Sequence, residues 1–145
     1  MSGMQSVIEI DRPVEAVYGF FLDLERNMIR TDPKVESVVK TPDGPIGPGT
    51  TFRIRQPVLG RPRDQLMRVL SVDPNRRIEL EAEFGPVRPL LDLTFEPTAN
   101  GTRITMRGDS RPRGPLSLVP FIADRIGQRN WNRRLRLIKG NLEAS

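Results

Sequence analysis

The sequence predicts an α+β fold, in which an antiparallel sheet packs against a long C-terminal helix. Three observations predict it: one strand-like segment opens the chain, helical patterns lie near both ends, and about six further strand-like segments fill the middle. Strands that follow one another through tight turns pair as antiparallel neighbours and bury one face against helices. We therefore expect about six to seven strands in a single domain that spans residues 1–145.

The opening strand and the helices after it are predicted from local signals. The stretch "MQSVIEI" places apolar residues among polar ones, as a short strand does. Asp11 is expected to cap one or two short helices, with Pro13 in the first turn. The Asp32-Pro33 pair is expected to end this helical region. Its apolar face repeats at spacings of three and four: Val14, Val17, Phe21, Leu24 and Met28.

Strand alternation predicts which face of the sheet is buried. In "RIELEAEF" apolar and acidic residues alternate, and this period of two gives one buried face and one face in water. Charged residues on the outer face, such as Arg53 and Arg103, are expected to pair with opposite charges on neighbouring strands. The strands after the first are expected at residues 34–40, 51–58, 65–72, 77–84, 90–97 and 102–108.

The composition excludes several kinds of chemistry. The chain has no Cys, which rules out a disulfide framework or a thiolate ligand, and no His, which removes the commonest general base and metal ligand. We expect no metal site and no cofactor. No apolar run is long enough for a signal peptide or a membrane span, so we expect a cytoplasmic protein without a transmembrane segment.

The positive charge is concentrated toward the C-terminus. Residues 103–139 contain ten basic residues and two acidic ones, a net charge of +8, which leaves −3 for the rest of a chain whose total is +5. Such a segment attracts phosphates. However, only 6% of the residues are aromatic, and no base-stacking side chains alternate with the arginines. Specific nucleic-acid binding is therefore not expected.

A long helix is predicted over residues 115–142. Its apolar stripe repeats at spacings of four, three and four, and we expect this stripe to pack on the sheet: Trp131, Leu135, Ile138 and Leu142. Four basic residues fall off the stripe and are expected on the wet side of the helix: Arg133, Arg134, Arg136 and Lys139.

The first half of this helix leaves two interpretations open. Its apolar residues, Ile122 and Ile126 among them, fall on nearly the opposite side from the later stripe. In one interpretation the helix bends at Gly127 and turns them into the interior. In the other it runs straight, and segment 116–126 offers an apolar, Arg-flanked surface to a protein partner, a second copy or the periphery of a membrane.

Four segments carry a family resemblance: "IDRPVEAVYGFFLDLE", "SVDPNRRIEL", "FEPTANGTRITM" and "LRLIKGNLE". In this order and spacing they resemble the START-like superfamily, also called SRPBCC, and especially its polyketide cyclase/dehydrase-like branch. The resemblance implies a helix-grip fold, a curved antiparallel sheet around the C-terminal helix. It also implies a cavity between sheet and helix for an apolar or amphipathic small molecule. Functions in the superfamily range from carriage of ligands to cyclisation of polyketides, so the fold alone does not fix the function.

The leading hypothesis is a protein, monomeric or homodimeric, that binds a hydrophobic or amphipathic ligand of lipid, quinone or polyketide type. The alternative is an aromatase/cyclase-like enzyme in which Asp124 or Tyr18 transfers a proton, because a buried carboxyl or phenol can do so where no His is present. Asp92 alternates with Leu91 and Leu93 and is expected to point outward. The expected cavity lining is Phe21, Met28, Phe52, Ile54, Leu80, Phe84, Leu91, Leu93, Phe95, Ile104, Met106, Phe121, Asp124, Gln128 and Trp131.

Overall fold

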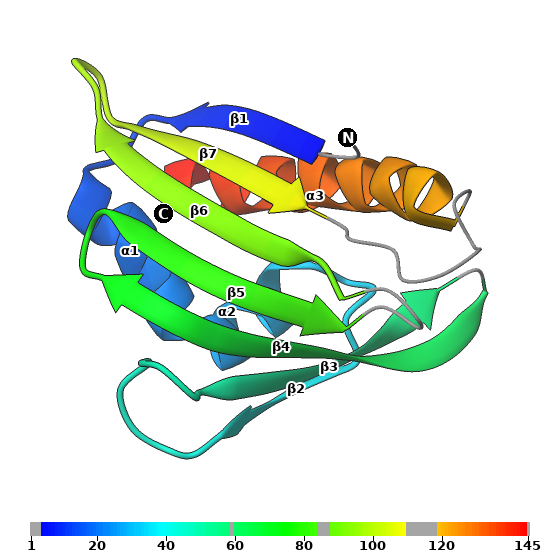
Figure 1. Cartoon of the computed structure of the whole chain (residues 1–145). Coiled ribbons are helices and arrows are strands. Elements are labelled where there is room, and N and C mark those ends of the chain that lie inside the picture. The colour runs from blue at the N-terminus through cyan, green and yellow to red at the C-terminus, as the bar shows by residue number, and fades with distance from the viewer. Residues whose placement is uncertain (1–3, 59, 84–87, 110–118, 145) are drawn as a thin grey trace.

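The chain folds into a seven-stranded antiparallel sheet with two short helices and one long helix (Figure 1). This computed structural model describes residues 4–58, 60–83, 88–109 and 119–144, and the description is confined to the backbone at Met4, at Val58, at residues 119–128 and at Asn130. The elements in chain order are β1 (Met4–Ile10), α1 (Val14–Leu22), α2 (Leu24–Thr31), β2 (Ser37–Thr41), β3 (Thr51–Val58), β4 (Arg61–Asp73), β5 (Arg77–Glu83), β6 (Leu90–Pro97), β7 (Thr102–Asp109) and α3 (Val119–Ala144). Among the described residues, no helix combines the length and the apolar character needed to cross a membrane.

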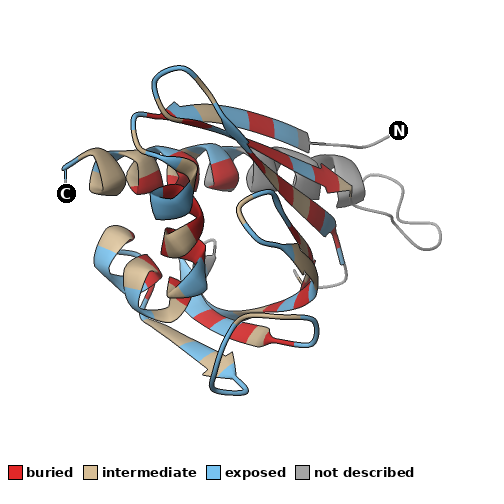
Figure 2. Ribbon diagram, turned by 90° about the vertical axis from the view of Figure 1, so that its left-hand side faces the viewer, coloured by how far each residue is buried: buried red, intermediate tan, exposed pale blue. Residues whose placement is uncertain are grey.

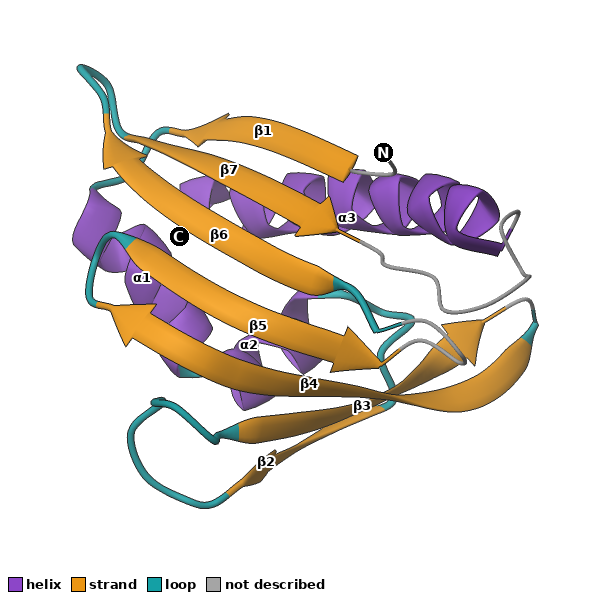
Figure 3. Ribbon diagram, in the orientation of Figure 1, coloured by secondary structure: helices purple, strands orange, loops and turns teal. Residues whose placement is uncertain are grey.

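The strand order is β1-β7-β6-β5-β4-β3-β2, so that β2 to β7 form a meander and β1 joins its last strand. Consecutive strands pair because the connections between them are short, whereas α1 and α2 carry the chain from β1 to the opposite edge of the sheet. Figure 3 shows the curved sheet as one layer, with the helices on its concave side. The predicted α+β helix-grip fold is confirmed.

The concave face of the sheet carries the core. Along β5, for example, Ile78, Leu80 and Ala82 are buried and the acidic residues between them are not. Register places apolar residues opposite one another across the strands, as with Leu80 and Leu91. Figure 2 shows the buried positions alternating with exposed ones along the strands. Each large apolar side chain buried in this way contributes about 1.5–3 kcal/mol relative to an exposed one.

Several predicted boundaries shift in the structure. The helical region divides into two helices at Asp23, and Asp11 does not cap it: the N-cap is Pro13, without a side-chain hydrogen bond. The strand predicted from residue 34 begins at Ser37, and the strand predicted from residue 65 begins at Arg61. The last two differences reflect pairing with β3, which determines where an extended segment acquires ladder hydrogen bonds.

Opposite charges pair across the outer face, as the alternation predicts. Arg77 on β5 forms two hydrogen bonds with Asp92 on β6, at 2.8 and 2.9 Å. Arg103 on β7 contacts Glu9 on β1 at 2.9 Å. These side chains are partly exposed to water, so each pair contributes little to stability. Asp92 therefore points outward, as expected.

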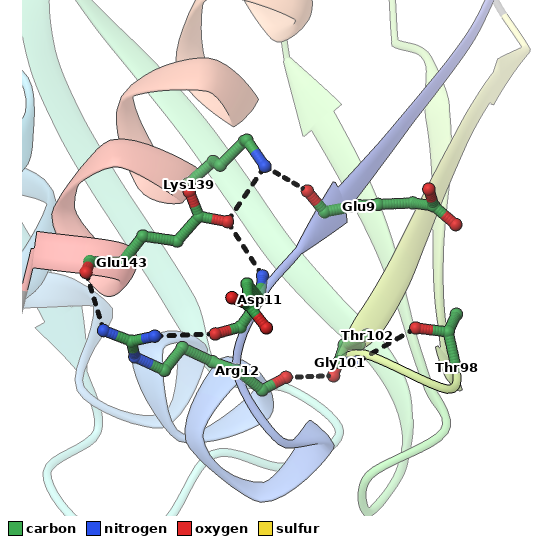
Figure 4. Close-up of polar contacts among 8 residues, drawn as sticks. All are labelled: Glu9, Asp11, Arg12, Thr98, Gly101, Thr102, Lys139 and Glu143. Atoms are coloured by element: carbon green, nitrogen blue, oxygen red, sulfur yellow. Dashed lines mark hydrogen bonds and ion pairs between the residues drawn. The ribbon is translucent and has the colours of Figure 1, made fainter.

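Hydrogen bonds join the end of α3 to the end of β1 and to the connection between β1 and α1 (Figure 4). Glu143 Oε2 accepts hydrogen bonds from the backbone N–H of Asp11, at 2.8 Å, and from Lys139 Nζ, at 2.9 Å. Lys139 Nζ also donates to the carbonyl of Glu9, and Arg12 donates to the carbonyl of Glu143. These bonds lower the pKa of Glu143, first through the Asp11 N–H and then through Lys139.

The turn between β6 and β7 packs against the same connection. Gly101 N–H donates to Thr98 Oγ1, and Thr102 Oγ1 donates to the carbonyl of Arg12 at 2.9 Å (Figure 4). A Cβ atom at Gly101 would lie 2.1 Å from the carbonyl oxygen of Ile10 and 2.8 Å from the backbone nitrogen of Arg12. The close approach of these two backbone segments therefore requires glycine at this position.

Candidate ligand-binding site

The predicted cavity lining forms one buried apolar cluster between the sheet and the helices. Its described members are at most 6% exposed, and they come from α1, α2, the four strands β3, β5, β6 and β7, and α3. They are Phe21, Met28, Phe52, Ile54, Leu80, Leu91, Leu93, Phe95, Ile104, Met106 and Trp131. The other predicted members lie outside the described residues: Phe84 and the side chains of Phe121, Asp124 and Gln128.

Aromatic rings from α1 meet Phe95 at one end of this cluster. Tyr18 and Phe21 each contact Phe95 edge to face, with ring centroids 5.5 Å apart in both pairs. Burial raises the pKa of the Tyr18 phenol, and the negative charge of Asp73 raises it further. At neutral pH the phenol therefore keeps its proton and can act as a hydrogen-bond donor or an acid.

Arg134 is buried, so the prediction that it lies on the solvent-exposed side of α3 is wrong. It is 7% exposed, its guanidinium carbon lies 5.3 Å from the centroid of the Trp131 ring, and its Nη2 donates to Gln56 Oε1 at 2.9 Å. Burial lowers the pKa of Arg134; the charge of Asp32 opposes this and the charge of Arg133 adds to it. The physical reason for the error is position. Arg134 follows Trp131 by three residues and precedes Ile138 by four, which places it on the buried stripe.

Two glutamines extend this polar contact across the concave face. Gln56 follows the buried residues Phe52 and Ile54 on β3 at intervals of two, so it lies on the same inward face. Its Nε2 donates to Gln65 Oε1 on β4 at 2.8 Å. A hydrogen-bonded row therefore runs from Arg134 through Gln56 to Gln65. Neither glutamine was predicted from the sequence. The signal that could have found them is their position two residues from buried apolar residues, Ile54 on β3 and Met67 on β4, which places each glutamine on the inward face.

An ion pair joins α3 to the end of α2. Asp32 is 1% exposed, and its two carboxylate oxygens accept from Arg133 Nη1 and Nη2 at 3.0 and 2.9 Å. Burial would raise the pKa of Asp32. The hydrogen bonds from Arg133 and from the Lys34 N–H, together with the charges of Arg133 and Arg134, outweigh burial and hold this pKa below its ordinary value. Arg133 is thus half-buried rather than on the wet side.

Of the other two basic residues predicted on the exposed side of α3, one is exposed and one is bound to neighbouring residues. Arg136 is exposed, as predicted, whereas Lys139 is bound to Glu143 and to the Glu9 carbonyl. The backbone of α3 is helical without interruption from Val119 to Ala144, Gly127 included. The side chains of Ile122 and Ile126, and with them the apolar surface predicted for 116–126, lie outside the described residues.

A separate recess of about 770 Å³ lies at the end of the sheet where β4 turns into β5. It is open to solvent, and its lining includes the turn residues Pro74 and Asn75 together with Glu96 and Arg107 from the outer face. Of the predicted cavity residues it includes Phe95. This recess is open to solvent and is lined by both polar and apolar residues. It therefore does not resemble the enclosed apolar site that a small hydrophobic ligand requires.

Comparisons with known proteins extend these observations. The family model described as "Polyketide cyclase / dehydrase and lipid transport" matches residues 1–143. The solved structure of Ara h 8.0201 superposes with a TM-score of 0.80 at 13% identity, over 99% of this chain and 98% of that one. A protein of Thermus thermophilus superposes with a TM-score of 0.78 at 20% identity, over 98% of this chain and 97% of that one. No curated protein matches in sequence.

A further neighbour is longer than this chain. The di-domain ARO/CYC BexL from the BE-7585A biosynthetic pathway superposes with a TM-score of 0.80 at 24% identity, over 99% of this chain and 47% of that one. At these identities the structural neighbours share the fold. The family model, by contrast, covers nearly the whole sequence and agrees with the START-like, polyketide cyclase-like resemblance of its segments. The chain belongs to the polyketide cyclase/dehydrase and lipid transport family.

Proposed function

We propose that the protein binds a small apolar or amphipathic molecule, of lipid, quinone or polyketide type, between the concave face of the sheet and α3. The observation that carries the proposal is the apolar concave face itself, to which the five neighbouring strands β3 to β7 contribute buried side chains. Such a surface favours ligands that bury most of their own area against hydrophobic and aromatic walls. Family membership supports the same function.

The proposed lining consists of the eleven described apolar residues named above, with Phe84, Phe121, Asp124 and Gln128 as further proposed members. Native mass spectrometry and thermal-shift measurements with fatty acids, quinones and aromatic polyketides test the proposal. We expect at least one of these classes to bind and to raise the melting temperature, because a ligand that binds only the folded state stabilises it. Absence of binding by all three classes would refute carriage.

A substitution at Ala82 tests where the ligand lies. Ala82 is 1% exposed and points inward from β5 on the same face as the proposed lining residue Leu80, so the larger side chain in Ala82→Leu would occupy space at the proposed site. We expect ligand affinity to fall by about tenfold, the penalty for losing well-fitted apolar contacts. The matched control is Glu81→Leu, which places the same side chain on the outer face of the same strand and should leave affinity unchanged.

The opposite outcome at Ala82 is also informative. If the interior is filled by protein side chains at this point, Ala82→Leu overpacks the core and lowers stability by about 1–3 kcal/mol. Unchanged affinity combined with such a loss, measured by urea unfolding, would exclude the space near Ala82 from the binding site.

A second candidate function, favoured by the similarity to the di-domain ARO/CYC BexL, is aromatase/cyclase-like catalysis on a poly-β-ketone. Tyr18 is then the described candidate for proton transfer, because its phenol is buried and protonated at neutral pH. Tyr18→Phe should lower turnover by about 100-fold or more, the usual contribution of a general acid. Unchanged turnover in both Tyr18→Phe and Asp124→Asn would remove these two assignments.

A further inference from the structure

The buried guanidinium of Arg134 has an N–H group whose hydrogen bond is accepted by no described residue. Nε of Arg134 is buried and has no hydrogen-bond partner among the described residues, although Nη2 of the same group donates to Gln56 Oε1 at 2.9 Å. A guanidinium carries its donors in a fixed planar fork and has no acceptor. Buried donors without an acceptor are rare in folded proteins. The described part of the chain therefore leaves an acceptor atom missing beside Nε.

The positive charge of Arg134 also lacks a negative charge to balance it among the described residues. The charges that act on it are those of Asp32 and Arg133, and these two residues neutralise each other through a bidentate pair at 2.9 and 3.0 Å. The Asp32 carboxylate in addition accepts the Lys34 N–H, so its oxygens are engaged. A guanidinium does not lose its proton inside proteins. Within the described residues, Arg134 thus remains a positive charge in the interior with no negative charge of its own.

The guanidinium is held in place before any ligand arrives. Gln56 accepts from Nη2, and Gln56 is itself fixed by donating to Gln65 at 2.8 Å. The Trp131 ring packs against the guanidinium, with 5.3 Å between its centroid and the guanidinium carbon. A preorganised donor loses little freedom when it binds an anion, which makes its interaction with that anion stronger.

We propose that Arg134 binds the carboxylate of an amphipathic ligand whose apolar part lies against the concave face of the sheet. This inference rests on the proposed function and narrows it from apolar molecules in general to monoanionic acids. A carboxylate supplies both the missing acceptor for Nε and the missing negative charge, and the fork of a guanidinium matches its two oxygens. The apolar residues next to Arg134 on α3, Leu135 and Ile138, are buried and face the same interior.

Calorimetric titration with two matched pairs of probes tests this inference. Decanoate is compared with decanol, and 2-naphthoate with 2-naphthol, so that each pair shares a skeleton and differs in the anionic head, while the two pairs separate aliphatic from aromatic acids. At pH 7 we expect the wild-type protein to bind the acid of at least one pair about 10- to 100-fold more tightly than its alcohol.

Three variants assign the preference to Arg134, and a fourth, Arg134→Met, tests whether its buried charge is uncompensated. Arg134→Gln should reduce the acid-to-alcohol ratio to below about threefold, and Arg134→Lys, which keeps the charge but not the fork, should give an intermediate ratio. Arg136→Gln is the matched control, because Arg136 is exposed on the same helix, and it should keep the wild-type ratio. Arg134→Met should melt at or above the wild-type temperature without ligand, because it removes an uncompensated buried charge.

The outcomes separate the two proposals. Equal affinity for acid and alcohol in the wild type, or a ratio unchanged in Arg134→Gln, would overturn the role of Arg134 and leave ligand binding intact. Failure of all four probes to bind would overturn this inference, while the quinone and polyketide arms above would still decide the proposed function. A preference confined to one pair supports the inference and identifies the acid as aliphatic or aromatic.

Discussion

Replacing Asp32 with alanine is expected to lower the free energy of unfolding by about 3 kcal/mol, the low end of the cost of removing one partner from a buried ion pair. The carboxylate side chain is 2% exposed and holds Arg133, 101 residues away in sequence, through two hydrogen bonds. The cost stays at the low end because Arg133 is 34% exposed and can turn toward water once Asp32 is gone. Urea unfolding at pH 7 measures it.

The control for this substitution is Asp64→Ala. Asp64 also pairs with an arginine, Arg55, but both side chains are about half exposed on the outer face. Its loss should therefore change stability by about 0–1 kcal/mol. If Asp32→Ala costs no more than Asp64→Ala, the pair between Asp32 and Arg133 does not stabilise the attachment of α3 to α2.

The contribution of Asp32 has a defined dependence on pH. The pKa of Asp32 is lower in the folded protein than its ordinary value of 3.8, so the unfolded chain binds more protons in the interval between the two. The stabilisation is fully present above the ordinary value and is lost as the pH falls through the folded-state pKa. The difference in stability between wild type and Asp32→Ala should therefore be constant near neutrality and shrink below about pH 4.

The second large effect is expected at Gly101. Gly101→Ala should cost about 3 kcal/mol, the upper part of the range for overpacking, because the new Cβ would lie 2.1 Å from the Ile10 carbonyl oxygen. The obstacle is backbone on both sides, so no side chain can rotate away. Relief requires the turn before β7 to separate from the β1–α1 connection, which also breaks the hydrogen bond from Thr102 to the Arg12 carbonyl. Chemical denaturation measures the loss.

Gly140→Ala is the matched control for this substitution. Gly140 lies in α3, exposed and with nothing within 4 Å of an added Cβ. Alanine is the better helix former by about 1 kcal/mol, so this variant should be more stable than the wild type. A stability loss at Gly140 similar to that at Gly101 would show that alanine is disfavoured for reasons other than the contact with Ile10.

The strands and the apolar stripe of the C-terminal helix could be predicted because their apolar residues recur at the regular spacing of a strand or a helix. Alternation at Ile78, Leu80 and Ala82 identifies the buried face without knowledge of the neighbouring strands. Trp131 and Leu135 likewise identify the inward face of α3. In both cases burial follows residue by residue from local geometry, so one sequence is sufficient.

The polar interior could not be predicted in the same way. Arg134 occupies the buried stripe by position, but an arginine is ordinarily exposed, and residue type outweighed spacing in the prediction. Its partner Gln56 and the pair between Asp32 and Arg133 depend on contacts across 78 and 101 residues. A local sequence period carries no information on contacts between residues so far apart in the chain. These contacts are determined by how the sheet and the helices pack together.

The pairing of β1 with β7 also determines the order in which the molecule can form. Strands β3 to β7 can each pair with the preceding strand as synthesis proceeds, but β1 has no partner in the sheet until β7 exists, because Met4 pairs with Gly108. Closing so long a loop is slow, and contacts of this separation reduce folding rates. The last step therefore joins β1, β7 and α3 together, and until then the apolar concave face lacks the cover that α3 provides.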